Sequence, residues 1–209
     1  NNLAKTKGKN WHIPDKVNFI TLDPRGMFGG AVFHGPDINS QYTFESIFGG
    51  LVCSFGGNSA ENEFYGMGGS IGISSDMKNV RHSAELMVKV MGLGAKTGKM
   101  AIGKADNLSD KMKEMIEDDE RVIINNGKIV SDLITEIYAD FNKEFTEKYA
   151  SRVGTGECIV NGDDFRKALK DWKSRQTPEK QEELRKCDEV ILQIIDCTKK
   201  GIAVGKKDK

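Results

Sequence analysis

Charge and glycine are divided unevenly along this chain, and the division falls near Asp76. Of the 31 basic and 31 acidic residues, 11 in total lie in residues 1–75, and the remaining 134 residues carry 51. In contrast, 13 of the 23 glycines and ten of the sixteen aromatic residues lie in the first part. Low charge with many glycines and aromatic residues is typical of short strands and tight turns, whereas high charge with periodic apolar residues is typical of helices. We therefore expect an α+β fold.

The first part is expected to form a glycine- and aromatic-rich antiparallel sheet of about four to six strands. Residues 17–22 and 30–34 are strand candidates that end at Pro- and Gly-containing turns. Residues 42–48 and 51–55 flank Gly49-Gly50, a pair that favours a two-residue hairpin turn. Residues 64–74 are a further, glycine-interrupted strand candidate.

The second part is expected to form a bundle of about five helices, because apolar residues recur there at intervals of three and four. The expected helices begin near Asp76, Asp106, Val130, Asp163 and Thr177, and Thr177-Pro178 is a typical helix start. Residues 121–130 around Asn125-Asn126-Gly127 form either a small hairpin or a turn before the third helix. Because no Pro- or Ser-rich linker separates residues 1–75 from residues 76–209, we expect one continuous α+β unit.

Phe-Gly-Gly occurs three times, at residues 28–30, 48–50 and 55–57, and Met67-Gly68-Gly69 is similar. One interpretation is that loop tips present apolar anchors to another subunit. The other is that an antiparallel meander has a glycine at each corner and an aromatic residue at each strand end. Under the first interpretation the interface residues are Phe28, Phe48, Phe55 and Met67.

Residues 92–104 are rich in glycine and lysine and form a candidate anion site. The stretch Gly92–Lys99 is similar to a phosphate-binding loop, but Leu93 stands where a glycine is required and Met100 where Ser or Thr is required. A looser nest of backbone N–H groups is the alternative form of such a site. Its residues are Gly94, Lys96, Gly98, Lys99 and Lys104.

Gly162-Asp163-Asp164 resembles the metal-binding motif of viral RNA-dependent RNA polymerases, over about eight residues only. That motif requires a strand after the carboxylates, whereas the pattern after Asp164 is helical, so Asp163 is better explained as a helix N-cap. The three histidines fall in separate segments, and no H-E-x-x-H or G-x-S-x-G motif is present. The acidic run from Glu114 to Glu120 is typical of a solvated helix end. We expect no catalytic residues, no metal and no other cofactor.

The balance of charge and the spacing of cysteines indicate a soluble, intracellular protein. A net charge of zero does not indicate nucleic-acid binding. No apolar run is long enough to span a membrane, and no signal peptide is visible. The four cysteines lack C-x-x-C spacing, which indicates reduced thiols.

Two functions are compatible with these patterns. The first is a non-enzymatic structural or assembly subunit, a homo-oligomer or part of a multiprotein complex, which associates through a low-charge sheet and amphipathic helices. The alternative is an anion- or nucleotide-binding domain, with or without enzymatic activity, that uses residues 92–104. The sequence favours the first.

Overall fold

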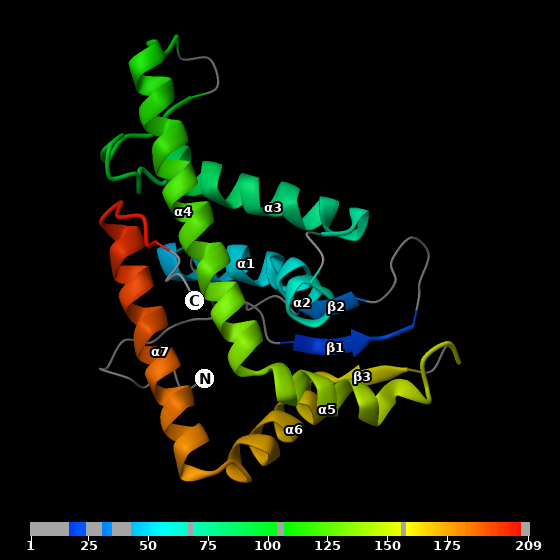
Figure 1. Ribbon diagram of the computed structural model, residues 1–209. Helices are drawn as coiled ribbons and strands as arrows, with labels where there is room; N and C mark the ends of the chain where they lie inside the picture. Colours follow the sequence, from blue (N-terminus) through cyan, green and yellow to red (C-terminus); the bar gives the residue numbers. More distant parts are fainter. Residues whose placement is uncertain are drawn as a thin grey trace.

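The computed structural model describes residues 17–23, 31–34, 43–66, 69–103, 107–155 and 158–205 (Figure 1). In these ranges the strands are β1 (Val17–Thr21), β2 (Ala31–His34) and β3 (Ile159–Asn161). The helices are α1 (Phe44–Ser54), α2 (Gly56–Tyr65), α3 (Ser74–Glu85), α4 (Asp110–Ile137), α5 (Ala139–Ala150), α6 (Gly162–Ser174) and α7 (Pro178–Lys199), with the short helices η2 (Ile71–Ile73) and η3 (Leu86–Val90).

Helix α4 is the longest element and runs through the middle of the molecule (Figure 1). Helices α1, α2, α3 and α7 all pack against it, and the small sheet lies next to α6. The sheet order is β2-β1-β3 with antiparallel pairing throughout. The expectation of a mixed fold with an antiparallel sheet and a helical C-terminal part is confirmed.

The sheet is smaller than expected, and its third strand comes from the other part of the chain. Strand β3 lies in the helical part and pairs with β1 through Phe19 and Asn161. The strand expected at residues 64–74 instead contains the end of α2, a left-handed Gly66 and η2. The sequence pattern did not reveal β3, because a strand of three residues is too short to show a periodicity of its own.

The hairpin predicted for residues 42–55 is wrong, because Phe44–Ser54 form the helix α1. A capping box starts the helix: the Thr43 hydroxyl accepts from the Ser46 N–H, and the Ser46 hydroxyl accepts from the Thr43 N–H. The apolar side chains of this segment fit a period of 3.6 as well as one of two, and the first buries them all on one face. The buried side chains are Phe44, Ile47, Phe48 and Leu51.

Neither a hairpin nor a turn occurs at Asn125-Asn126-Gly127, because α4 is continuous through these residues. Asn126 is fully buried and makes its hydrogen bonds to residues far along the chain. A Cβ at Gly127 would overlap the side chain of Leu51, so this glycine permits close packing of α1 on α4. Tertiary packing therefore explains why Asn126 and Gly127 stand at these positions, and turn geometry does not.

The described helices bury two apolar clusters. The larger cluster joins α1, α3, η3, α4 and α7, and the smaller joins α5, α6 and β3. Phe48 and Phe55 belong to the larger cluster and are 1% and 5% exposed, so they are not surface anchors. Phe28 and Met67, the other predicted interface residues, lie outside the described residues.

Residues 1–75 are not a purely β-rich segment, since they include α1 and α2. All four cysteines lie in the described residues, and none of them forms a disulfide there. Among the described residues, no helix combines the length and apolarity that a bilayer crossing requires.

Close packing of α6 on β1 generates a prediction. A Cβ at Gly162 would overlap the backbone carbonyl oxygen of Val17, whereas a Cβ at Gly50 would meet nothing within 4 Å. Gly162→Ala is therefore expected to lower the free energy of unfolding by roughly 1–3 kcal/mol through overpacking. Gly50→Ala, in the interior of α1, is expected to raise it by about 0.5–1 kcal/mol. Urea unfolding followed by circular dichroism measures both, and a neutral Gly162→Ala contradicts the described packing.

Candidate functional site

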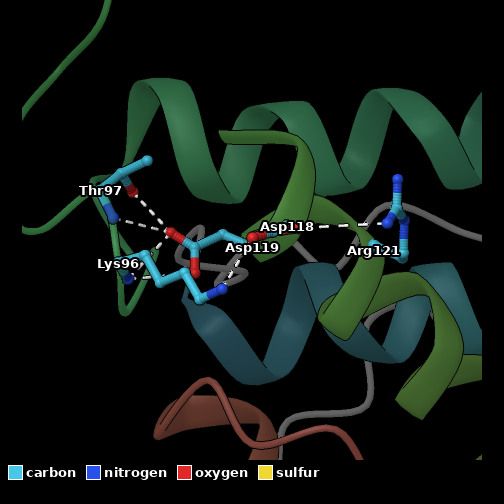
Figure 2. Close-up of polar contacts among 5 residues, drawn as sticks. All are labelled: Lys96, Thr97, Asp118, Asp119 and Arg121. Atoms are coloured by element: carbon cyan, nitrogen blue, oxygen red, sulfur yellow. Dashed lines mark hydrogen bonds and ion pairs between the residues drawn. The ribbon is translucent and has the colours of Figure 1, made fainter. Parts of the chain in front are cut away.

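The glycine-rich loop that follows η3 folds back on the N-terminal half of α4 (Figure 2). Gly92 and Gly98 adopt left-handed conformations, with φ of 60° and 77°, which glycine reaches without strain. Gly94 and Gly98 form an isolated antiparallel bridge. This local geometry turns the backbone N–H groups of Lys96 and Thr97 toward α4.

The side chain of Asp119 receives these N–H groups. Its carboxylate accepts from the Lys96 N–H at 3.1 Å, from the Thr97 N–H at 2.8 Å and from the Thr97 hydroxyl at 2.9 Å (Figure 2). Asp119 and Thr97 are each 3% exposed. A Cβ at Gly94 would overlap both the Thr97 hydroxyl and the Asp119 carboxylate. The loop is thus an anion nest whose anion is a carboxylate of the same chain.

A second ion pair lies at the surface of the loop. The Lys96 ammonium contacts the Asp118 carboxylate at 2.7 Å, and Arg121 approaches the same carboxylate at 4.0 Å (Figure 2). The hydrogen bond from Lys96 lowers the pKa of Asp118, and the reciprocal hydrogen bond raises the pKa of Lys96. Both groups are solvent-exposed, so the pair contributes little to stability.

The predicted anion-binding residues are therefore only partly brought together. Gly94, Lys96 and Gly98 lie in the loop, and the Lys96 N–H already donates to Asp119. Lys99 is exposed, and Lys104 lies outside the described residues. Binding of an external anion by residues 92–104 stays a prediction.

The burial of Asp119 was not expected, because the acidic run of residues 114–120 is typical of a solvated helix end. Ile116 and Ile123 are buried in α4, and Asp119 follows the first by three residues and precedes the second by four. That spacing places the carboxylate on the buried face of the helix. The sequence signal for this buried carboxylate was its position on α4, where the helical spacing predicts an apolar side chain.

Two carboxylates have a pKa that is raised above the ordinary value. Burial raises the pKa of Asp76, in the first turn of α3. Burial also raises the pKa of Asp188, in α7, where Lys173 partly opposes the effect.

The described residues include no cluster of three or more His, Cys, Asp or Glu side chains that could hold a metal ion. His82 lies in α3 and is exposed, His12 lies outside the described residues, and His34 ends β2. The Gly162-Asp163-Asp164 stretch begins α6. The predicted N-cap, Asp163, is wrong, because the N-cap of α6 is Asn161. The Asn161 side chain accepts from the Asp163 N–H at 2.8 Å.

The nest generates a prediction about Asp119. Asp119→Asn replaces an acceptor oxygen with a donor that faces other donors, so we expect a loss of roughly 1–3 kcal/mol in the free energy of unfolding. Amide hydrogen exchange at Lys96 and Thr97 should become faster. Asp118→Asn, the neighbouring exposed control, should cost less than about 1 kcal/mol. Equal effects of the two substitutions would show that the nest does not hold the loop.

Similarity to known proteins indicates the family of this chain, which the geometry of the loop and α4 does not. The sequence profile described as peptidase family M41 matches residues 8–154, which is more than two thirds of the chain. The match extends over the glycine-rich loop, Asp119 and the whole of α4.

Three curated relatives bear the name ATP-dependent zinc metalloprotease FtsH. The protein of Ruminiclostridium cellulolyticum is 31% identical over 144 residues, which cover 61% of this chain and 23% of the relative. That of Aquifex aeolicus is 28% identical over 123 residues, covering 52% and 19%. That of Cutibacterium acnes is 25% identical over 178 residues, covering 77% and 24%. This chain spans less than a quarter of the length of these relatives.

These findings correct the functional expectation. A non-enzymatic structural subunit is wrong, because the matching family consists of peptidases and the relatives are named as metalloproteases. The enzymatic part of the alternative was closer. Catalytic chemistry was missed because the sequence shows no H-E-x-x-H motif and the composition carries no catalytic signature. By the extent of its match, the chain belongs to peptidase family M41.

Proposed function

We propose that this chain is part of a peptidase that hydrolyses peptide bonds in protein substrates. The observation that carries the proposal is the family match over residues 8–154, which includes α1 to α5. The names of the three relatives support the same class of reaction. In this proposal the helices around α4 form the scaffold of a proteolytic domain.

The described residues do not fit a zinc site. Catalytic zinc in proteases takes three protein ligands, and H-E-x-x-H supplies two histidines from one helical face. None of the three histidines of this chain stands four positions from another, and the described residues contain no metal-binding cluster. We therefore assign no zinc ligand set to these residues and route no catalytic step through the metal.

Among the described carboxylates, we propose that Asp76 takes part in hydrolysis, as a positioned acid or base. Perturbed pKa values gather at functional sites, and both Asp76 and Asp188 have raised values. Asp76 lies within residues 8–154 and Asp188 lies beyond them. Asp188 is also opposed by Lys173, whereas burial is the cause of the Asp76 shift.

The first experiment tests hydrolysis itself. The protein is isolated at the length at which its own cell makes it and is incubated with fluorescently labelled, unfolded casein. We expect cleavage of casein into smaller fragments, because the chain belongs to a family of peptidases. An intact protein that does not cleave casein contradicts the proposal.

The second experiment tests Asp76. Asp76→Asn is expected to lower kcat by at least about 100-fold, the typical contribution of a positioned acid or base. Asp188→Asn is the matched control and should leave kcat unchanged. Loss of activity in both variants would argue against a specific role of Asp76.

The pH dependence of folding separates that effect from a structural one. A carboxyl whose pKa is raised by folding contributes stability below its unfolded pKa and loses that contribution as the pH rises through the folded value. Asp76→Asn should therefore gain stability relative to the unsubstituted protein as the pH rises from acid to neutral. If Asp76 acts in hydrolysis, the Asp76→Asn variant stays folded while its kcat falls.

Self-association and membership of a larger assembly remain proposals. Several large apolar side chains are exposed, including Ile71 at 93% and Tyr65 at 74%. Exposed apolar side chains are the kind of surface that association would bury.

A further inference from the structure

A carboxylate of α2 holds the short helix η2, which leads into α3. Glu61 accepts from the Ser70 N–H at 2.8 Å through one oxygen and from the Ser70 hydroxyl at 2.5 Å through the other. The Ser70 hydroxyl oxygen in turn accepts from the Gly72 N–H at 3.3 Å and caps η2. One side chain of α2 thereby fixes the cap of the helix that precedes α3.

The segment of residues 69–73 is held to α2 mainly by polar contacts. Ile71 is 93% exposed, so its side chain contributes no packing that could hold η2 in place. Gly69 has a φ of 124°, and a Cβ there would come within 3.1 Å of the Asn58 amide nitrogen on α2. The Glu61–Ser70 hydrogen bonds and this close approach at Asn58 therefore determine where the segment lies relative to α2.

Helix α2 is a fixed support for these contacts. It packs on α4, and the buried Ser59 hydroxyl donates to the Ser131 hydroxyl of α4 at 3.0 Å. The hydrogen bonds from Ser70 lower the pKa of Glu61, so its carboxyl group is ionised at neutral pH. An ionised acceptor makes stronger hydrogen bonds than a neutral one. The position of η2 is thus tied, through α2, to the longest helix of the protein.

The first turn of α3 depends on η2 for its position. Helix α3 begins at Ser74, directly after η2, and η2 packs against it. Its N-cap is Ile73, whose apolar side chain cannot accept from the N–H groups of the first turn. Asp76 is the third residue of α3. The nearest side-chain cap before Asp76 is therefore Ser70, which Glu61 holds.

We infer that Glu61 is a positioning residue for Asp76, because through Ser70 and η2 it holds the first turn of α3 in place. This inference rests on the proposed function, in which Asp76 acts as an acid or base in hydrolysis. A displacement of about 1 Å in a reacting group can cost about 100-fold in rate. Loss of the hydrogen bonds to Ser70 should therefore lower kcat. The KM should change little, because Glu61 itself does not bind the substrate.

The test measures kcat and KM for casein cleavage by the protein at the length at which its own cell makes it. Glu61→Ala is expected to lower kcat at least about tenfold and to change KM less than about twofold, as expected for an interaction needed in the transition state. Glu61→Gln keeps an oxygen that accepts from the Ser70 N–H, so it should lower kcat less than about threefold. Glu63→Ala, at an exposed glutamate of the same helix, is the control and should leave both constants unchanged.

A double substitution shows whether Glu61 acts through Asp76. Effects of residues that act as a unit are not additive. Asp76→Asn with Glu61→Ala should therefore be no slower than Asp76→Asn alone. Losses that multiply overturn the inference, because Glu61 then acts independently of Asp76. If Asp76→Asn is slow and Glu61→Ala is not, the inference fails and the proposed function stands. If Asp76→Asn is as active as the unsubstituted protein, the proposed role of Asp76 fails.

Amide hydrogen exchange tests the contact without any measurement of activity. In Glu61→Ala the N–H groups of Ser70 and Gly72 should exchange faster, because their hydrogen bonds depend on the carboxylate and on the hydroxyl that it holds. Circular dichroism should show that the variant stays folded. Unchanged exchange at both groups overturns the inference whatever the activity of the variant.

Discussion

The arrangement of this protein depends on polar side chains that α4 carries into its buried face. Asp119, Asn126 and Ser131 are each 3% exposed or less. An unsatisfied buried polar group costs about 1–3 kcal/mol, so each must find a partner. Asp119 binds the loop after η3, Asn126 binds the segment after α7, and Ser131 accepts from the Ser59 hydroxyl of α2 at 3.0 Å. One helix thereby fixes three segments that are distant in sequence.

The same interactions give the glycine-rich loop its character. Its backbone N–H groups form a nest, the geometry by which many proteins bind phosphate. Here Asp119 occupies that position and is itself part of the region that matches peptidase family M41. The loop therefore contributes to the scaffold, and the Lys96–Asp118 pair at its surface adds little because water screens it.

The family assignment and the cavity beside α4 have different origins in this fold. The assignment comes from similarity along residues 8–154, and the described side chains supply no metal cluster. The cavity, of about 970 Å³, comes from packing, because α2 and α7 both pack on α4 and all three helices line it. Asn126 belongs to both, since it stands on α4 within the family match and its side chain holds the segment after α7, which lines the cavity.

The sequence by itself determined the elements whose signals are local. Thr177 caps α7 with Pro178 at its first position, and α3 begins at Ser74, close to Asp76, where its pattern indicated a helix start. The tertiary structure alone decided that Phe44–Ser54 is a helix, that α4 continues through Asn126-Gly127, and that Asp119 is buried. Caps and periodicity act within one or two turns, so they are visible in a short stretch of sequence. A buried amide or carboxylate is stabilised by partners brought close only by folding, so no local pattern reveals it.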